Sequence, residues 1–546
     1  MRPITLGLTA CLLGTAAQAQ MACEDATTEA LGLSDARVTS AEAVPAGEGS
    51  PAHCLVNGVM AERTGMDGRD YALRFALALP DDWNGRFVHQ FNGGSDGEVK
   101  APTGAMGSGT GETTPLERGY AVVSSDAGHD GAAVDDAGLA GGTRFGFDFE
   151  ARRMYGYGAV ETLDPVARDM IEAFYAAPIE YAYGVGCSNG GRHAMVAASR
   201  MPEAFDGILA TAPGYLLPKA ALQHAVDVQA LSAPTGDLAS SFPAEDLALV
   251  ATGVRAACDA LDGLEDGMVQ DVEACQSAFD IGALQCTDGQ NDDCLSEAQV
   301  TALSQSVAGS LDGSDPVYSD WYWDTGIESG NWRFWKLESQ IPPWGNLPLI
   351  AVMGSASLAQ VFTTPPTQVA GDPDSLLAFV SDFDLSARAD AIDATTEDFP
   401  ESAMEVMTPP GWDDPQLAGL RDAGGKLIVA HGTSDPVFSA RDTADWYQKL
   451  DANNGDNAED FALYYPVPGM AHCSGGPTLD GYDLFAELVD WVENDSAPEA
   501  VTVAARPGND ETPAELAGAT RPLCPAPTVA RYTGEDPQSA DSFTCE

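Results

Sequence analysis

The chain has 546 residues, 44% of them hydrophobic, and carries 83 acidic against 26 basic residues, a net charge of −57. A chain of this length can bury one large core or two. Its negative charge repels nucleic acid and anionic membranes, so both are disfavoured as partners. Because the acidic residues are scattered along the sequence, we interpret them as a solvated surface.

Residues 1–19 have the pattern of a secretory signal peptide. Arg2 supplies a positive start, residues 4–13 an apolar core, and Ala17-Gln18-Ala19 a small-x-small cleavage motif. A lipoprotein box that ends in Cys11 is the alternative, but it would cut the apolar core short. We expect cleavage after Ala19 and a secreted or periplasmic protein. No later apolar run is long enough to span a membrane.

Of the 11 cysteines, Cys11 lies in the signal and ten remain. An even number in an exported chain indicates disulfides, and the lack of a CxxC spacing argues against zinc. Pairing of sequence neighbours joins Cys23 with Cys54, Cys258 with Cys275, Cys286 with Cys294, and Cys524 with Cys545. Cys187 and Cys473 are left over and are predicted to pair with each other.

The first predicted elements are strands at residues 69–79 and 86–91. The second strand runs into the glycine-rich stretch 92–97, where backbone N–H groups could face a substrate without obstruction from side chains. A simple turn is an equally good interpretation of this stretch by itself. A buried strand at 120–124 and an amphipathic helix at 159–175 follow.

The motif Gly186-Cys187-Ser188-Asn189-Gly190 lies between an apolar run at 181–185 and an amphipathic run at 192–201. Strand, sharp turn and helix around Gly-x-Ser-x-Gly is the pattern of a nucleophile elbow, which leaves the serine hydroxyl exposed. A plain strand-to-helix turn is the alternative. We take Ser188 as the candidate nucleophile.

The alternation of predicted strands and helices resumes in the rest of the chain after a long interruption. A strand is predicted at 205–212, whereas the proline- and tryptophan-rich residues 215–413 show little regular alternation. Strands at 426–431 and 461–467 and helices at 439–450 and 482–492 then follow. Alternating strands and helices indicate a mostly parallel sheet. We predict an α/β-hydrolase fold formed by residues 20–214 and 414–546, with residues 215–413 as a lid.

A serine nucleophile needs a base and an acid that orients the base. In α/β-hydrolases the order is serine, acid, histidine, with the acid and the histidine on loops that follow strands. Asp435 and His472 each follow a predicted strand in the required order, so we predict a Ser188–His472–Asp435 triad. Cys187 directly precedes Ser188 and Cys473 directly follows His472, so their disulfide would fix the distance between nucleophile and base.

Residues 259–268 are dense in carboxylates and glycines, a composition that favours a calcium loop. The predicted Ca²⁺ ligands are the side chains of Asp259, Asp262 and Asp266 and the carbonyls of Leu264 and Met268. The loop is not an EF-hand, because it lacks the terminal glutamate and the flanking helices. In so acidic a chain, a solvated acidic turn is the alternative.

These motifs together resemble the tannase and feruloyl esterase family. The likeness rests on Gly186–Arg192, Phe205-Asp206-Gly207, the loop 258–268 and Gly469-Met470-Ala471-His472-Cys473, and it extends over nearly all of the mature chain. The resemblance implies the same triad, the five disulfides and calcium in the lid loop. It also implies oxyanion donors from the backbones of Gly94 and Asn189, and a ring-clamping role for Phe438.

The chain departs from the family members that hydrolyse terephthalate monoesters at two places. The residue after the nucleophile is Asn189 where those members have glutamate. They also carry a lid arginine for the free carboxylate, whereas residues 337–387 contain no basic residue here and Leu349 stands near the place of that arginine. Burying a carboxylate without a cation is costly, so neutral aromatic esters should be better substrates.

We therefore predict a secreted serine ester hydrolase that acts on small aromatic esters of feruloyl or galloyl type. A terephthalate monoester hydrolase is the alternative. A peptidase of the same fold is a further alternative, which the Cys187–Cys473 pair and the calcium loop disfavour. A non-catalytic binding protein is an alternative of another class, and the complete, correctly ordered triad disfavours it.

Overall fold

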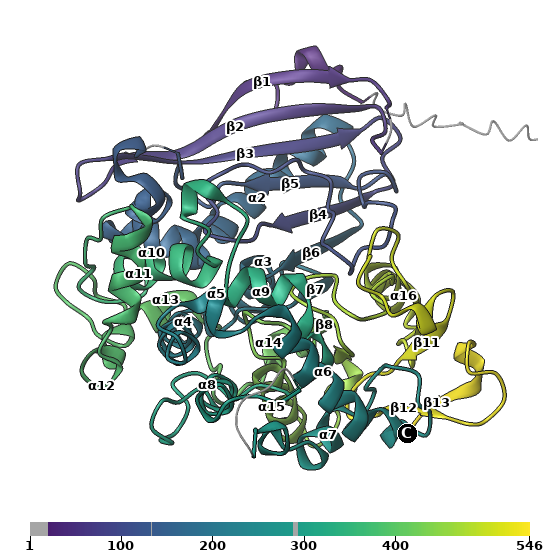
Figure 1. Ribbon diagram of the computed structural model, residues 1–546. Helices are drawn as coiled ribbons and strands as arrows, with labels where there is room; N and C mark the ends of the chain where they lie inside the picture. The colour runs from purple at the N-terminus through teal and green to yellow at the C-terminus, as the bar shows by residue number, and fades with distance from the viewer. Residues whose placement is uncertain (1–19, 48, 133, 288–292) are drawn as a thin grey trace, which may run out of the picture.

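The computed structural model describes residues 20–47, 49–132, 134–287 and 293–546 (Figure 1). The predicted signal peptide, its cleavage site and the Cys11 alternative lie outside the described residues. No helix within these described ranges is long and apolar enough to cross a membrane.

A mixed sheet organises the molecule, with its strands in the order β1-β2-β3-β5-β4-β6-β7-β8-β9. These strands are β1 (Ala36–Val44), β2 (His53–Thr64), β3 (Asp70–Pro80), β4 (Arg86–Phe91), β5 (Ala121–Ser125), β6 (Tyr181–Cys187), β7 (Gly207–Thr211), β8 (Lys426–Gly432) and β9 (Ala462–Val467). Pairing is antiparallel from β1 to β5 and parallel from β5 to β9. The sequence analysis predicted the parallel part but not β1 and β2.

Helices cover both faces of the parallel strands, which is why those strands are apolar along their whole length. The helices outside the long insertion are α1 (Phe149–Arg153), α2 (Ala159–Tyr175), α3 (Asn189–Arg200), α15 (Ala440–Asn453) and α16 (Leu484–Asn494). Ile208 and Val429 face a core shared with α2, α3 and α15. Their neighbours Leu209 and Ile428 face a second core shared with α16.

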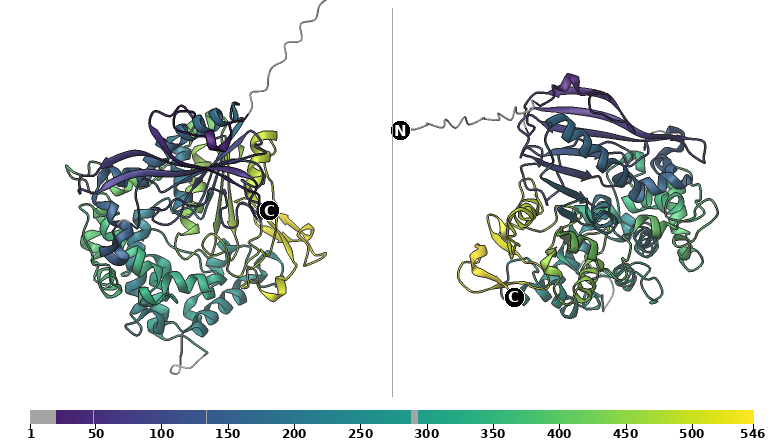
Figure 2. Two further views of the ribbon diagram at one scale, coloured as in Figure 1. Left: turned by 90° about the horizontal axis from the view of Figure 1, so that it is seen from above. Right: turned by 180° about the vertical axis from the view of Figure 1, so that it is seen from behind.

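The segment between β7 and β8 is helical in its described part and gathers on one side of the parallel strands (Figures 1 and 2). Its helices are α4 (Leu217–Ser232), α5 (Leu238–Ser241), α6 (Ala244–Cys258), α7 (Val272–Ala278), α8 (Glu297–Ala308), α9 (Gly330–Lys336), α10 (Ser355–Gln360), α11 (Pro373–Ser381), α12 (Leu385–Arg388), α13 (Ala403–Met407) and α14 (Ala418–Ala423). We propose that residues 215–413 of this segment form the lid, so that α14 belongs to the hydrolase domain.

Two small hairpins end the chain, β10 (Val501–Ala504) with β11 (Thr520–Leu523) and β12 (Ala530–Tyr532) with β13 (Phe543–Cys545). They are yellow in Figure 2 and contact the acidic lid loop 259–268. Arg521 pairs with Asp266, and Arg531 pairs with Asp271. The C-terminal extension therefore connects to the lid through ion pairs.

The cysteines form the five predicted pairs. The bonds join Cys23 with Cys54, Cys187 with Cys473, Cys258 with Cys275, Cys286 with Cys294, and Cys524 with Cys545.

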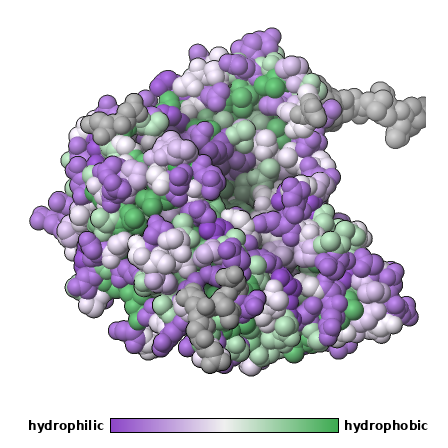
Figure 3. Space-filling model, in the orientation of Figure 1, coloured by the Kyte–Doolittle hydropathy of each residue, from purple (hydrophilic) through white to green (hydrophobic). Residues whose placement is uncertain are grey.

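The face of the molecule in Figure 3 is mostly hydrophilic, in keeping with acidic residues spread over a solvated surface.

Candidate active site

Ser188 occupies the sharp turn between β6 and α3. Its backbone has φ 66° and ψ −126°, a conformation that L residues rarely adopt and that the surrounding structure must hold in place. A Cβ at Gly186 would lie 2.3 Å from the carbonyl oxygen of Gly190, and one at Gly190 would lie 2.3 Å from the carbonyl oxygen of Phe91. Both glycines of the motif are thus required by close backbone approach, as a nucleophile elbow needs.

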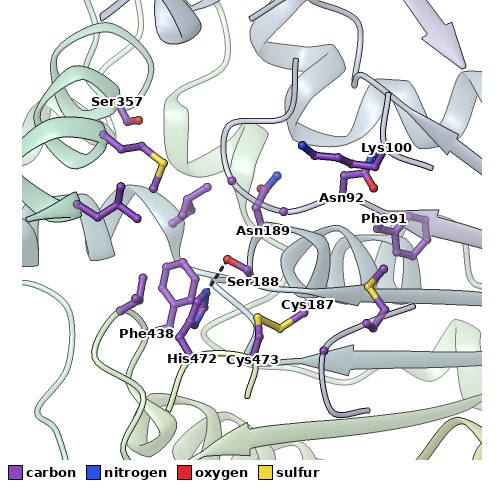
Figure 4. A pocket seen from close by; sticks show the side chains of 18 of the residues that line it. Phe91, Asn92, Lys100, Cys187, Ser188, Asn189, Ser357, Phe438, His472 and Cys473 are labelled. Carbon is purple, nitrogen blue, oxygen red and sulfur yellow. Dashed lines mark hydrogen bonds between the residues drawn. A yellow bond between two sulfur atoms is a disulfide. The ribbon is translucent and has the colours of Figure 1, made fainter. Parts of the chain in front are cut away.

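Asp435 and His472 converge on Ser188 from the loops after β8 and β9. The Ser188 hydroxyl lies 2.8 Å from His472 Nε2 (Figure 4). His472 Nδ1 lies 2.7 Å from Asp435 Oδ2. The structure therefore brings the three predicted triad residues into one hydrogen-bonded chain. In this chain, Asp435 accepts a hydrogen bond from His472 Nδ1, and His472 Nε2 accepts one from the Ser188 hydroxyl.

Asp435 is buried and lies among hydrogen-bond donors. Burial by itself raises the pKa of this carboxyl, but the charge of His472 and the hydrogen bonds from His431 and His472 outweigh burial and hold the pKa well below its usual range. The backbone N–H groups of Val437 and Phe438 also donate to Oδ1, at 2.7 and 3.1 Å. Asp435 is therefore ionised at neutral pH and can orient His472.

Sequence reasoning missed two further residues, one in contact with this acid and one that holds the loops beside it. His431 Nε2 lies 3.2 Å from Asp435 Oδ2, and its Nδ1 accepts from the Thr443 hydroxyl at 2.8 Å. Asp324, a lid residue, accepts from the Ser434 hydroxyl at 2.8 Å and from the Gly469 N–H at 3.3 Å. The spacing of four residues between His431 and Asp435 was a visible signal, whereas no local pattern marks Asp324.

The glycine-rich loop after β4 lies directly against the elbow. A Cβ on Gly93 would lie 3.5 Å from the Cβ of Ser188. Gly94 and Asn189, the predicted oxyanion donors, both line the cavity that contains Ser188. The Asn189 side-chain amide donates to Asp96 Oδ2 at 2.8 Å, which joins the elbow to this loop.

The cavity beside Ser188 has a volume of about 640 Å³. Phe438 and Trp335 present their rings edge-on to His472, with centroid distances of 5.4 and 5.3 Å. Leu349 lines the cavity, together with the lid residues Met353 and Ser357. The wall is mostly apolar and aromatic, which suits a flat organic substrate.

The disulfide between Cys187 and Cys473 lies at the floor of this cavity and joins residues 286 positions apart (Figure 4). Each cysteine is the direct neighbour of a triad residue. The bond therefore ties the nucleophile turn to the base loop covalently.

The predicted calcium loop is closed mainly by its own hydrogen bonds. Asp259 accepts from the N–H groups of Gly267 and Asp266 at 2.9 and 3.1 Å, and Asp266 pairs with Arg521. Asp262 Oδ2 is buried and has no hydrogen-bond partner. Burial, with the nearby carboxylates, raises the pKa of Asp262 to about 7.

Within the described ranges, no group of three or more His, Cys, Asp or Glu side chains is placed to hold a metal ion. The unpartnered oxygen of Asp262 fits a cation ligand, since an orphaned buried carboxylate oxygen is costly. Asp266 is already engaged by Arg521. The loop thus fits calcium through Asp262 and only in part through its other carboxylates.

Comparison with known proteins identifies the family. The family described as tannase and feruloyl esterase matches residues 54–546. The chain is 38% identical over 527 residues to mono(2-hydroxyethyl) terephthalate hydrolase of Piscinibacter sakaiensis, which covers 91% of this chain and 85% of that protein. It is 31% identical over 489 residues to a probable feruloyl esterase of Arthroderma benhamiae, covering 86% and 81%.

Solved structures agree in fold. Feruloyl esterase B from Aspergillus oryzae superposes with a TM-score of 0.74 at 22% identity, covering 96% of this chain and 99% of that one. An esterase from the same organism gives a TM-score of 0.75 at 20% identity, covering 96% and 100%. These matches confirm the predicted α/β-hydrolase fold. The chain therefore belongs to the tannase and feruloyl esterase family of carboxylic ester hydrolases.

Proposed function

We propose that this chain is an exported serine esterase that hydrolyses esters of aromatic carboxylic acids through Ser188, His472 and Asp435. The observation that carries the proposal is the continuous hydrogen-bonded chain from Asp435 to the Ser188 hydroxyl, at 2.7 and 2.8 Å, beside an aromatic cavity. Export is supported by the signal pattern at residues 1–19 and by the five disulfides, which persist in oxidising compartments.

In the proposed reaction, Ser188 Oγ attacks the ester carbonyl while its proton passes to His472 Nε2. The developing oxyanion accepts hydrogen bonds from the backbone N–H groups of Gly94 and Asn189. Asp435 stabilises the imidazolium, which then protonates the departing alcohol and leaves an acyl-enzyme. Water attacks the acyl-enzyme with His472 again as base, releases the aromatic acid and restores the serine hydroxyl.

The acyl group is assigned to the aromatic, lid-facing part of the cavity. Phe438 and Trp335 offer ring edges and faces there, and Leu349 and Met353 add apolar surface. No charged side chain of the lid lines this part of the cavity in the described residues. A neutral aromatic acyl group of feruloyl, galloyl or benzoyl type fits this surface without the desolvation cost of a buried charge.

A terephthalate monoester hydrolase is the second candidate. It is favoured by the 38% identity to the Piscinibacter sakaiensis protein of that name. Against it, Leu349 lines the cavity where a basic residue would be needed for the free carboxylate. Measuring kcat/KM for methyl ferulate, methyl gallate and mono(2-hydroxyethyl) terephthalate side by side decides between the two, and a clear preference for the terephthalate monoester would overturn our choice.

The triad is tested by Ser188→Ala. Removing the nucleophile should lower kcat by at least about 10⁴-fold without changing the melting temperature by more than a few degrees, because no core group is lost. A fluorophosphonate probe should label the parent protein and fail to label the variant. Activity within a few-fold of the parent would remove Ser188 from the mechanism.

Calcium in the loop 259–268 is part of the same proposal, as a structural ion. Asp262 would provide a side-chain oxygen to it, with Asp259 and the carbonyls of Leu264 and Met268 as neighbouring donors. The ion would rigidify the lid loop and neutralise part of its negative charge, and it takes no part in the ester chemistry.

A further inference from the structure

The catalytic cavity has an unusual charge for this protein. Acidic residues outnumber basic ones by 83 to 26 in the whole chain. Yet among the described residues that line the cavity beside Ser188 there is no aspartate or glutamate, and Lys100 is the one lysine or arginine. His224 also lines the cavity, but burial lowers its pKa to about 4, so it is neutral. Lys100 is therefore the one lysine, arginine, aspartate or glutamate among the described residues of the wall.

Lys100 lines a part of the cavity wall that the lid does not form. It belongs to the same loop after β4 as Gly94, and that loop continues along the cavity wall through residues 101–107. In Figure 4, Lys100 lies to the right of Ser188 and the lid residue Ser357 to the left, and the Lys100 ammonium points toward Asn189. With an aromatic acyl group at the lid side, the charge of Lys100 faces the alcohol part of the ester.

The partner of Lys100 does not hold it firmly. Glu98 forms an ion pair with it, but the two side chains are 54% and 70% exposed, and Glu98 does not line the cavity. Exposed pairs of this kind contribute little to stability and exchange partners easily. An anionic group of a bound substrate can therefore share or replace Glu98 at the ammonium.

We propose that Lys100 is a specificity residue that selects esters whose alcohol part carries a negatively charged group such as a carboxylate. This inference rests on the proposed serine esterase function. The net charge of −57 disfavours the approach of an anionic substrate, so a local cation at the alcohol end favours the binding of such a substrate at this place. The hydrolysis products would be an aromatic acid and a hydroxy acid.

The test compares three esters of one aromatic acid, ferulic acid. The alcohol part is glycolic acid, which is anionic, glycolamide, which is its neutral isostere, or methanol. In the parent protein, kcat/KM for the glycolate ester should exceed that for the glycolamide ester by about fivefold, which is the effect of one partly exposed ion pair. This ratio should fall toward one in 1 M NaCl.

Lys100→Met should lower the ratio of kcat/KM for the glycolate ester to that for the glycolamide ester to about one. It should change kcat/KM for the methyl ester by less than about twofold, since the side chain lies outside the triad and is half exposed. Glu98→Gln is the matched control and should increase the ratio, because it frees the ammonium. Melting temperatures of both variants should equal that of the parent.

Three results would overturn the inference. The first is a ratio that Lys100→Met leaves unchanged, and the second is an equal loss for all three esters, which would make Lys100 a support of the loop. The third requires a fourth substrate, mono(2-hydroxyethyl) terephthalate, whose charge is on the acyl ring. It is a loss of kcat/KM in Lys100→Met that is confined to this substrate. If the parent hydrolyses none of these esters, the proposed function itself fails, and this outcome is distinct from the other three.

Discussion

Asn189 has two roles that its place at the start of α3 makes compatible. Its backbone N–H is a proposed oxyanion donor, while its side chain lies between Asp96 and Arg192. Nδ2 donates to Asp96 at 2.8 Å, and Oδ1 accepts from Arg192 Nε at 2.7 Å. Burial raises the pKa of Asp96 well above its usual range, and the positive charge of Arg192 offsets this only in part. The two halves of the proposed oxyanion hole are thus connected through one amide–carboxyl contact.

Exchanging the two side chains tests this contact. Asn189→Asp alone places two carboxyl groups together and should lower kcat by about tenfold or more with little change in KM, because misplaced oxyanion donors act on the transition state. The double variant Asp96→Asn with Asn189→Asp restores a donor–acceptor pair and should recover kcat to within a few-fold of the parent. Steady-state kinetics of the single and double variants measure this, and an uncorrected loss in the double variant contradicts the positioning role.

Local sequence signals predicted some residues of the site, whereas others needed the fold. Gly186, Ser188 and Gly190 could be found because a tight turn needs glycine at fixed spacing. Asp435 and His472 could be found because each follows an apolar strand. Asp324 and Lys100 could not be found from the sequence, since the residues beside which each one lies at the site are distant from it in the sequence. Only the packing of the lid and the β4 loop against the strand ends brings them to the site.

Among the elements, the helices and strands with a strong apolar period were predicted closely. The helix predicted at 159–175 coincides with α2 (Ala159–Tyr175). The helix after the elbow begins at Asn189, three residues before the predicted start, because the turn places the motif's second glycine already inside α3. β1 is partly exposed and lies at the sheet edge, so its apolar pattern was too weak to detect.

The loops after β6 and β9 are joined by the bond between Cys187 and Cys473, and its removal should affect stability and rate together. In the chain-entropy model, closing 286 residues contributes about 6 kcal/mol. Replacing both cysteines by serine should therefore lower Tm and reduce kcat through a looser Ser188–His472 distance. Calorimetry and kinetics provide the two measurements.

The matched control for this change is Cys286→Ser with Cys294→Ser. That bond spans 8 residues and neither cysteine lines the catalytic cavity. Removing this bond should lower Tm by less than removing the bond between Cys187 and Cys473, and it should leave kcat unchanged. Equal effects of the two replacements on kcat would show that the bond beside the triad has no special role.

The acidic loop between α6 and α7 should respond to chelation. If it holds the proposed calcium ion, EDTA should lower Tm by several degrees, and added Ca²⁺ but not Mg²⁺ should restore it. Asp262→Asn should abolish the Tm response and leave esterase activity at low temperature within a few-fold of the parent. Protein purified without chelator that contains no stoichiometric calcium by elemental analysis would rule the ion out.

On the scale of the whole molecule, the charge imbalance opposes the compact state. A net charge of −57 on one chain produces repulsion that salt screens, with a Debye length that falls from about 10 Å at 0.1 M to about 3 Å at 1 M. Tm should therefore rise as NaCl increases over this range. KCl should act equally, and a Tm that stays constant or falls would mean that the acidic residues are too well separated to repel one another.

The bond between Cys187 and Cys473 also determines what a protease can do to this molecule. It closes residues 187–473 into a covalent ring that contains the whole lid. A single cut in a lid loop would give one fragment with Ser188 and another with Asp435 and His472, still joined at the catalytic pocket. A nicked molecule would therefore migrate as one species until it is reduced, and the two halves of its triad could not diffuse apart. A cut in the lid therefore does not by itself separate Ser188 from Asp435 and His472.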